Sequence, residues 1–302
     1  MMEQYRNQST PFFVVGAQRS GTTMLRLMLN SHPKLSVPHE SGFITVFYGK
    51  SASYGDLSHK ENAAKLLKDI SEYHFVKRGG LVRDMNAILS YPIAGYADLV
   101  NAIFTVCANS KGKSRWGDKT PGYTPDIDIL WKLFPCCRIV HLVRDGRDMA
   151  ISRQSITWGS GSIPRLAEDW RWKTIIAHKV GSVLGEQYLE VRYEDLVLQT
   201  ENTLRSICAF LQEDFHRDML DYHLTAESEV PTDSLQWHRT SVKAPDSSKL
   251  YLWKHKMSLS DRIIFEQIAG EALELFGYER ENHSSTLGSR LKNLYYATLK
   301  RW

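Results

Sequence analysis

Short apolar runs alternate along the chain with longer amphipathic stretches. The run Pro11–Val15 is rich in Phe and Val, and its length suits a strand that is buried on both faces. Arg138–Val143 is a second buried run, and Gln187–Tyr193 alternates apolar and polar residues as a third strand. Because long helical patterns separate these runs, the sequence predicts an α/β fold with a parallel sheet that carries helices on both faces.

The segment after the first strand has the spacing of a phosphate-binding loop. Gly16 and Gly21 frame Gly-Ala-Gln-Arg-Ser-Gly-Thr-Thr, and a helical pattern follows until about Ser31. Backbone N–H groups of such a loop and the helix N-terminus form an anion cradle. Thr22 stands where nucleotide-binding loops carry lysine, and Arg19 is the cation of the loop, which favours an anion other than a magnesium-bound γ-phosphate. The alternative is an ordinary strand-to-helix turn.

The rest of the chain predicts a single domain with an insertion, a long loop and a separate tail. Helical patterns indicate an insertion over roughly 43–110. The stretch of roughly 228–250 has little periodicity and many Ser, Thr and Pro residues, which is typical of a functional loop. We expect the domain to span 1–281 and the tail 282–302.

Composition and charge exclude several classes of protein. The chain has 302 residues, 42% hydrophobic and 24% charged, which rules out a disordered chain and a disulfide-stapled miniprotein. Its net charge of +4 lies in 282–302, so residues 1–281 hold 34 basic and 34 acidic residues. A neutral body lacks the positive field of a nucleic-acid-binding protein, and no nucleic-acid partner is expected.

Within the tail, Leu287, Leu291 and Leu294 recur at helical spacing beside basic residues. This pattern predicts a basic amphipathic helix. It can dock on the protein's own body, on a membrane surface or on a partner, and the sequence leaves these alternatives open.

Four cysteines are present, without a CxxC pair or the Cys/His spacing of a metal site. The first residues are polar, and no apolar run of 18 residues occurs. We therefore expect a reduced, cytoplasmic protein that uses no metal.

A second segment strengthens the phosphate-loop interpretation. Arg144 follows the strand Arg138–Val143, and Ser152 follows eight residues later. Together with Gln18-Arg-Ser-Gly-Thr-Thr-Met24, this segment resembles the sulfotransferases that use 3′-phosphoadenosine 5′-phosphosulfate (PAPS). The resemblance implies a P-loop-type sheet in which Arg144 and Ser152 hold the 3′-phosphate. It also implies that the first loop holds the 5′-phosphosulfate, through Arg19, Ser20, Gly21, Thr22 and Thr23.

The similarity is greatest to the branch of tyrosylprotein sulfotransferases and their bacterial relatives. Glu40, seven residues after Pro33, falls at the position of that branch's catalytic glutamate. Lys119, in Trp-Gly-Asp-Lys-Thr-Pro, corresponds to the lysine that contacts the bridging oxygen of the donor. Tyr193, in Val-Arg-Tyr-Glu-Asp-Leu, corresponds to a tyrosine that helps bind the nucleotide.

The chain also departs from this branch. The arginines that recognise acidic residues around an acceptor tyrosine are replaced by Gly42 and Val46. The acceptor therefore stays open between a small molecule, a glycan and a peptidyl tyrosine. The family's last nucleotide-binding Ser and Lys have several candidates near Trp253, namely Ser247, Ser248, Lys249 and Lys254.

The resemblance implies in-line transfer of a sulfuryl group from PAPS to a hydroxyl, with Glu40 as the general base. His39 is the alternative base, because histidine has this role in the cytosolic small-molecule branch. Adjacent residues usually point to opposite sides, so we expect only one of His39 and Glu40 to face the acceptor. Lys119 and Arg19, with Arg144 and Arg147 as further candidates, would gather charge at one anion site. Other hypotheses are a P-loop kinase and a non-catalytic nucleotide-binding protein. His141, inside a predicted strand, is expected to be a core residue.

Overall fold

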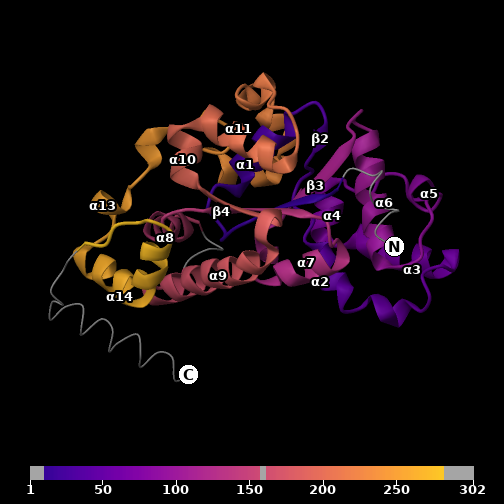
Figure 1. The fold of residues 1–302 in the computed structure, drawn as a ribbon, viewed down its shortest axis with the longest axis horizontal. Helices are drawn as coiled ribbons and strands as arrows, with labels where there is room; N and C mark the ends of the chain where they lie inside the picture. Colours follow the sequence, from indigo (N-terminus) through magenta and orange to yellow (C-terminus); the bar gives the residue numbers. More distant parts are fainter. Residues whose placement is uncertain (1–9, 157–160, 282–302) are drawn as a thin grey trace.

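Five parallel strands form the centre of the protein, in the order β2-β3-β1-β4-β5 (Figure 1). The computed structural model describes residues 10–156 and 161–281. The prediction of an α/β fold with a parallel sheet is confirmed. The strands are β1 (Phe12–Val15), β2 (Leu35–Ser36), β3 (Arg115–Lys119), β4 (Arg138–Val143) and β5 (Tyr188–Arg192).

Helices cover both faces of this sheet because successive residues of β1 point to opposite sides. Phe12 and Val14 pack with α1 and α11, whereas Phe13 and Val15 pack with the helices of the other face. The helices of the first face are α1 (Thr22–Asn30) and α11 (Thr200–Leu211); those of the second are α2 (Phe43–Tyr48), α3 (Lys60–Glu72), α6 (Tyr96–Asn109), α7 (Ile127–Leu133) and α9 (Ile163–Leu184).

A third apolar cluster lies beyond the carboxyl end of β4, where Ala17 and Val143 meet the indole of Trp170. The helices α13 and α14 gather at this end of the molecule, and α3, α5 and α6 lie at the opposite end (Figure 1). The remaining helices are α4 (His74–Gly79), α5 (Met85–Ile88), α8 (Gly146–Gln154), α10 (Tyr193–Leu198), α12 (Leu235–His238), α13 (Trp253–Lys256) and α14 (Leu259–Leu275).

The strand β3, between β2 and β1, was not predicted as a strand, because its sequence Arg-Trp-Gly-Asp-Lys contains three charged residues. All five of its residues are buried. Their polar groups are bonded inside the protein; the guanidinium of Arg115, for example, donates to the carbonyl of Thr10 at 2.7 Å. Hydrogen bonding of this kind removes the cost of burying such groups.

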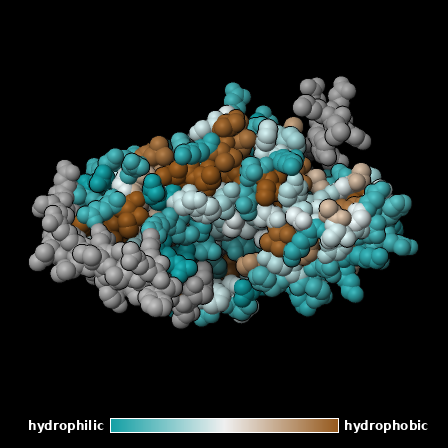
Figure 2. Space-filling model, turned by 90° about the horizontal axis from the view of Figure 1, so that it is seen from below, coloured by the Kyte–Doolittle hydropathy of each residue, from teal (hydrophilic) through white to brown (hydrophobic). Residues whose placement is uncertain are grey.

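His141 of β4 is fully buried, and its Nδ1 lies 2.6 Å from the hydroxyl of Tyr188. The prediction of a core histidine is confirmed. Exposed apolar residues are scattered, among them Trp131 and Trp172. On the face shown in Figure 2, hydrophobic patches alternate with polar side chains.

The segment predicted as a helical insertion contains α2 to α6, and the segment predicted as an irregular loop contains short 3-10 turns and α12. The predicted amphipathic tail, 282–302, lies outside the described residues. Within 10–156 and 161–281, none of the helices is both long enough and apolar enough to cross a membrane.

Candidate active site

The loop between β1 and α1 has an unusual backbone conformation. Gly16 and Gly21 have positive φ angles of 153° and 91°, and Arg19 has a φ of 72°. A residue other than glycine rarely adopts such an angle, and strain of this kind is concentrated at functional sites. The N–H of Gly16 donates to Oγ1 of Thr124 at 2.9 Å, which anchors the start of the loop.

The ring of Tyr193 packs directly on the backbone of Gly21. A Cβ atom at Gly21 would lie 2.3 Å from Cδ2 of Tyr193, which is closer than any real contact. Tyr193 follows the last residue of β5 and begins α10, so it sits at the carboxyl edge of the sheet with the loop. Glycine is thus required at position 21 both by its φ angle and by this ring.

Arg144 and Ser152 both contact Arg19 of the loop. The guanidinium of Arg144 is 4.7 Å from the centroid of the Tyr193 ring and 3.6 Å from Oδ2 of Asp148. Its buried Nε has no hydrogen-bond partner among the described residues. Oγ of Ser152 accepts a hydrogen bond of 3.1 Å from Nε of Arg19.

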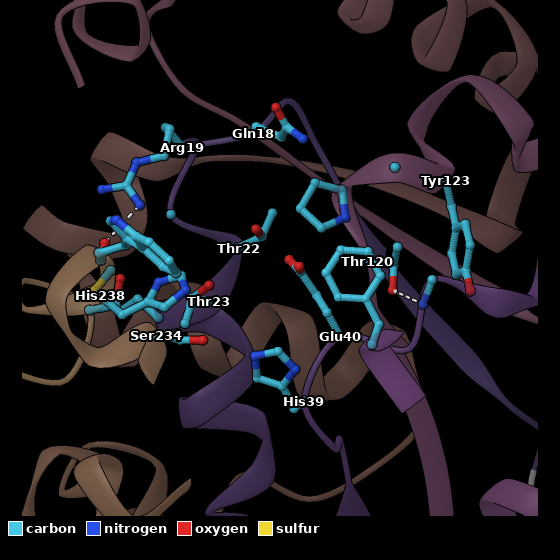
Figure 3. A pocket seen from close by; sticks show the side chains of 18 of the residues that line it. Gln18, Arg19, Thr22, Thr23, His39, Glu40, Thr120, Tyr123, Ser234 and His238 are labelled. Carbon is cyan, nitrogen blue, oxygen red and sulfur yellow. Dashed lines mark hydrogen bonds between the residues drawn. The ribbon is translucent and has the colours of Figure 1, made fainter. Parts of the chain in front are cut away.

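Arg19 also connects the loop with a segment far along the chain. Its Nη1 donates to the carbonyl of Trp237 at 2.8 Å (Figure 3). Burial, followed by the positive charge of Arg144, lowers the pKa of Arg19. Nη1 of Arg144 also donates to the carbonyl of Arg19 at 3.3 Å, so both side chains lie at the same loop, where their charges favour an anion.

Lys119, the last residue of β3, binds both the loop and the predicted base. Its Nζ is 2.6 Å from Oε1 of Glu40 and 3.3 Å from Oγ1 of Thr23. The Lys119 side chain is 3% exposed and that of Glu40 is 25% exposed, so the carboxylate is the partner that faces the cavity. Figure 3 shows the Glu40 side chain extended towards Thr22.

Each partner changes the ionisation of the other. Burial raises the pKa of Glu40, but the charge of Lys119 and the hydrogen bond from it outweigh this effect and leave the pKa below its usual range. Burial lowers the pKa of Lys119, and Glu40 opposes that shift. The pair is therefore held together as an ammonium and a carboxylate.

Asp118 fixes the chain next to this pair. Oγ of Ser41 donates to Oδ2 of Asp118 at 2.5 Å and lies 3.1 Å from the hydroxyl of Tyr123. Asp118 is fully buried, and burial raises the pKa of its carboxyl to about 7. Because Ser41 follows Glu40, this network holds Glu40 against the end of β3.

His39 and Glu40 both line the cavity, whereas adjacent residues were expected to point to opposite sides. The two side chains diverge within the same space (Figure 3). Burial, followed by the charge of Lys119, lowers the pKa of His39 to about 4. The imidazole is thus uncharged at neutral pH, and its buried Nδ1 has no partner within the described part of the chain.

Sequence reasoning missed several residues of the cavity wall. Trp237 and His238 come from α12, and Phe75 and Arg78 come from α4. Burial, followed by the charge of Lys119, lowers the pKa of His238 to about 3. Only the tertiary fold brings these segments to the loop; the low periodicity of 228–250 was the one sequence signal of a functional role.

The cavity has a volume of about 650 Å³ and contains most of the predicted site residues. Ser20 is buried outside it, and its Oγ has no partner among the described residues. Arg147 belongs to a different network: its guanidinium binds Asp145 at 2.8 Å and Glu266 at 2.6 Å. The predicted residues on the wall are Arg19, Gly21, Thr22, Thr23, His39, Glu40, Arg144, Ser152 and Tyr193.

Among the late candidates for nucleotide contacts, Lys249 contacts Arg144 through its backbone. Its carbonyl accepts a hydrogen bond of 3.2 Å from Nη2 of Arg144. Lys254 instead lies over the rings of Tyr251 and Trp253, with Nζ 5.6 Å from each centroid. In the described residues, His, Cys, Asp and Glu side chains form no group of three or more that could hold a metal ion.

Comparisons with known proteins agree on one family. The family model described as the sulfotransferase family matches residues 11–217. The chain is 24% identical over 251 residues to protein-tyrosine sulfotransferase A of Caenorhabditis elegans, which covers 79% of this chain and 60% of that protein. It is 28% identical over 147 residues to nodulation protein NoeE of Sinorhizobium fredii, which covers 49% of this chain and 31% of that protein. The chain thus spans 60% or less of these two relatives.

Two solved structures share the fold. The sulfotransferase domain of the Synechococcus PCC 7002 olefin synthase aligns with a TM-score of 0.62 and 23% identity, over 91% of this chain and 97% of that domain. The sulfotransferase domain from the curacin biosynthetic pathway aligns with a TM-score of 0.58 and 17% identity, over 91% of this chain and 100% of that domain.

Proposed function

This chain belongs to the sulfotransferase family, and we propose that it transfers the sulfuryl group of PAPS to the hydroxyl of an acceptor. The observation that carries the proposal is the ion pair of 2.6 Å between Lys119 and Glu40, next to Thr23 of the phosphate loop. It supplies a cation for the charge that develops on the donor and a carboxylate for the proton of the acceptor, at one place.

The loop and its surroundings fit the donor. The N–H groups after Gly21 and the N-terminus of α1 would hold the 5′-phosphosulfate. Arg144, whose buried Nε has no partner among the described residues, would bind the 3′-phosphate with Ser152. Tyr193, packed on Gly21 and below the guanidinium of Arg144, would contact the nucleotide.

The reaction then needs one proton transfer and one exchange of bonds at sulfur. Glu40 accepts the proton of the acceptor hydroxyl, whose oxygen forms the new S–O bond. The bond between sulfur and the bridging oxygen breaks, and its electron pair stays on the 5′-phosphate of adenosine 3′,5′-bisphosphate. Lys119 already contacts Thr23, so it can turn from Glu40 to the bridging oxygen as negative charge grows there.

This movement would also activate the base. Lys119 keeps the pKa of Glu40 low, whereas burial alone raises it. When the ammonium turns to the donor, Glu40 loses that stabilisation and binds a proton more readily. His39 is the alternative base; it is uncharged near neutral pH and lines the same cavity.

Transfer of radiolabelled sulfate from PAPS to a panel of phenols, sugars and peptides tests the proposal, and labelled product is expected with at least one class. Calorimetry with adenosine 3′,5′-bisphosphate and with ATP, each with and without magnesium, separates the alternatives. Magnesium-dependent preference for ATP would favour a kinase. Tight binding of the bisphosphate without labelled product would favour a non-catalytic nucleotide-binding protein.

A further inference from the structure

The cavity wall away from the phosphate loop offers no uncommitted positive charge in the described part of the chain. The Lys and Arg residues that line the cavity are Arg19, Arg78 and Arg144, and of these Arg19 and Arg144 lie on the donor side. Arg78 of α4 forms an ion pair with Asp233, whose neighbour Ser234 lines the cavity. Its Nε and Nη2 donate to Oδ2 of Asp233 at 2.9 and 2.5 Å.

The same part of the wall is aromatic. The rings of Tyr73, His74 and Phe75 lie close together at tilted angles of 57° and 40°, with centroid distances of 4.6 Å and 4.0 Å between successive rings. The ring of Phe75 lies against Gly42: a Cβ at Gly42, whose φ is 61°, would be 2.9 Å from it. A side chain at position 42 would displace this ring, so the aromatic surface depends on glycine there.

We propose that the acceptor is an uncharged aryl hydroxyl compound and that the Arg78–Asp233 ion pair sets this preference. The inference rests on the sulfotransferase function proposed above. An anionic acceptor would enter beside Glu40 and Asp126, the two acidic residues of the described cavity wall, without an unpaired cation to compensate. A flat ring can instead stack on the surface formed by Tyr73, His74 and Phe75.

The chemistry of the base supports an aryl rather than an alkyl hydroxyl. Glu40 is a carboxylate, a class of group with an ordinary pKa of about 4, and is thus a weak base. An aryl hydroxyl has a pKa near that of tyrosine, about 10, whereas an alkyl hydroxyl is close to water at about 16. A weak base removes the proton of the former more readily. The cavity of about 650 Å³ must also admit the sulfate end of the donor, which limits the acceptor to a small molecule or a single side chain.

The test compares 4-methylphenol with 4-hydroxyphenylacetate, which differ in one carboxylate, as acceptors for labelled PAPS. We expect kcat/KM to be at least about tenfold higher for the neutral phenol. Asp233→Asn releases Arg78 and should shift the ratio towards the anionic phenol by at least about threefold. Glu72→Gln is the matched control, since it breaks the exposed 2.7 Å pair with Lys77 outside the cavity wall and should leave the ratio unchanged.

Equal use of both phenols by the native protein would overturn the inference, as would a ratio that Asp233→Asn leaves unchanged. Efficient transfer to sugars or alkyl alcohols but not to phenols would overturn it while the sulfotransferase function stands. If no acceptor of the panel is sulfated although adenosine 3′,5′-bisphosphate binds, the proposed function is wrong, and the inference that rests on it is wrong as well.

Discussion

Nζ of Lys119 lies 2.6 Å from Oε1 of Glu40 although 79 positions separate the two residues in the chain. Both residues are positioned by β3. Lys119 is its last residue, and Glu40 is held next to it by the hydrogen bond between the following residue, Ser41, and Asp118 of β3. The catalytic proposal can therefore be tested from either partner, and the two substitutions have different expected results.

Replacement of the carboxylate should stop transfer without loss of nucleotide binding. Glu40→Gln is expected to lower kcat at least about 100-fold, because the acceptor hydroxyl loses its base. The affinity for adenosine 3′,5′-bisphosphate, measured by calorimetry, should stay within about threefold, since the loop is unchanged. If His39→Ala is the inactive variant and Glu40→Gln is active, the base has been assigned to the wrong residue.

Replacement of the lysine should affect both rate and pH dependence. Lys119→Met removes the cation and is expected to raise the barrier by about 2–4 kcal/mol. Burial then acts on Glu40 without its main opposing charge, so the pKa of Glu40 rises. The acid limb of the pH–rate profile should move to higher pH than in the native protein. A profile that keeps its position would show that Glu40 does not control this limb.

Loss of Arg144 should weaken the binding of nucleotides that carry a 3′-phosphate. Arg144→Ala is expected to reduce the affinity for adenosine 3′,5′-bisphosphate by about 10- to 100-fold and to affect adenosine 5′-phosphate much less. Arg153→Ala is the control, because Arg153 lies on α8, the helix that begins two residues after Arg144, and pairs with Asp169 at 3.3 Å. An equal loss for both nucleotides would mean that Arg144 supports the loop rather than the 3′-phosphate.

A methyl group at position 21 should disrupt the cradle. Gly21→Ala places a Cβ 2.3 Å from the Tyr193 ring at a φ of 91°, and we expect a loss of about 1–3 kcal/mol in the free energy of unfolding together with weaker nucleotide binding. Gly49→Ala is the control, because Gly49 has a φ of −64° and a Cβ added there would have nothing within 4 Å. Denaturant titration should show little change in its free energy of unfolding. A stable Gly21→Ala variant with native affinity would contradict the described contact.

The buried Asp118 should make stability depend on pH. Its pKa is raised to about 7, so the folded state holds a proton that the unfolded state releases near pH 4. The native protein therefore loses stability as the pH rises from about 4 to 7, by at most about 1.4 kcal/mol per unit from this group. Asp118→Asn does not titrate, and Ser41 can reverse its hydrogen bond to the new amide.

Thermal unfolding at several pH values checks this linkage. The difference in melting temperature between Asp118→Asn and the native protein should grow in favour of the variant as the pH increases from 5 to 8, a span that brackets the value of about 7. Asp128→Asn, at an exposed position, should follow the native curve. A constant difference for Asp118→Asn would mean that the carboxyl keeps an ordinary pKa.

The fold was predictable where burial follows hydrophobicity. β1 and β4 are apolar runs with few polar residues, and the sequence identifies both. β3 escapes such a prediction, because the burial of Arg115, Asp118 and Lys119 is compensated by partners distant in sequence. The two-residue strand β2 is too short to show any periodicity.

Some residues of the candidate site could likewise be predicted from the sequence, and others could not. The loop glycines, Arg144 and Tyr193 were predictable because each lies at a fixed offset from a recognisable strand. Trp237 and Arg78 were not, since each reaches the cavity through contacts that no local pattern encodes. The expectation that His39 and Glu40 face opposite sides failed because the chain there is not a regular strand, so alternation does not apply.

The hydrogen bond from Arg19 to the carbonyl of Trp237 joins a stretch of the chain that the family model matches to one that it does not match. The loop belongs to residues 11–217, which the family model matches, whereas Trp237 and Asp233 lie beyond them. Under the proposed function, the donor site and part of the acceptor wall come from separate portions of one polypeptide. Replacement of the later portion alone is then expected to change the acceptor while the donor site stays the same.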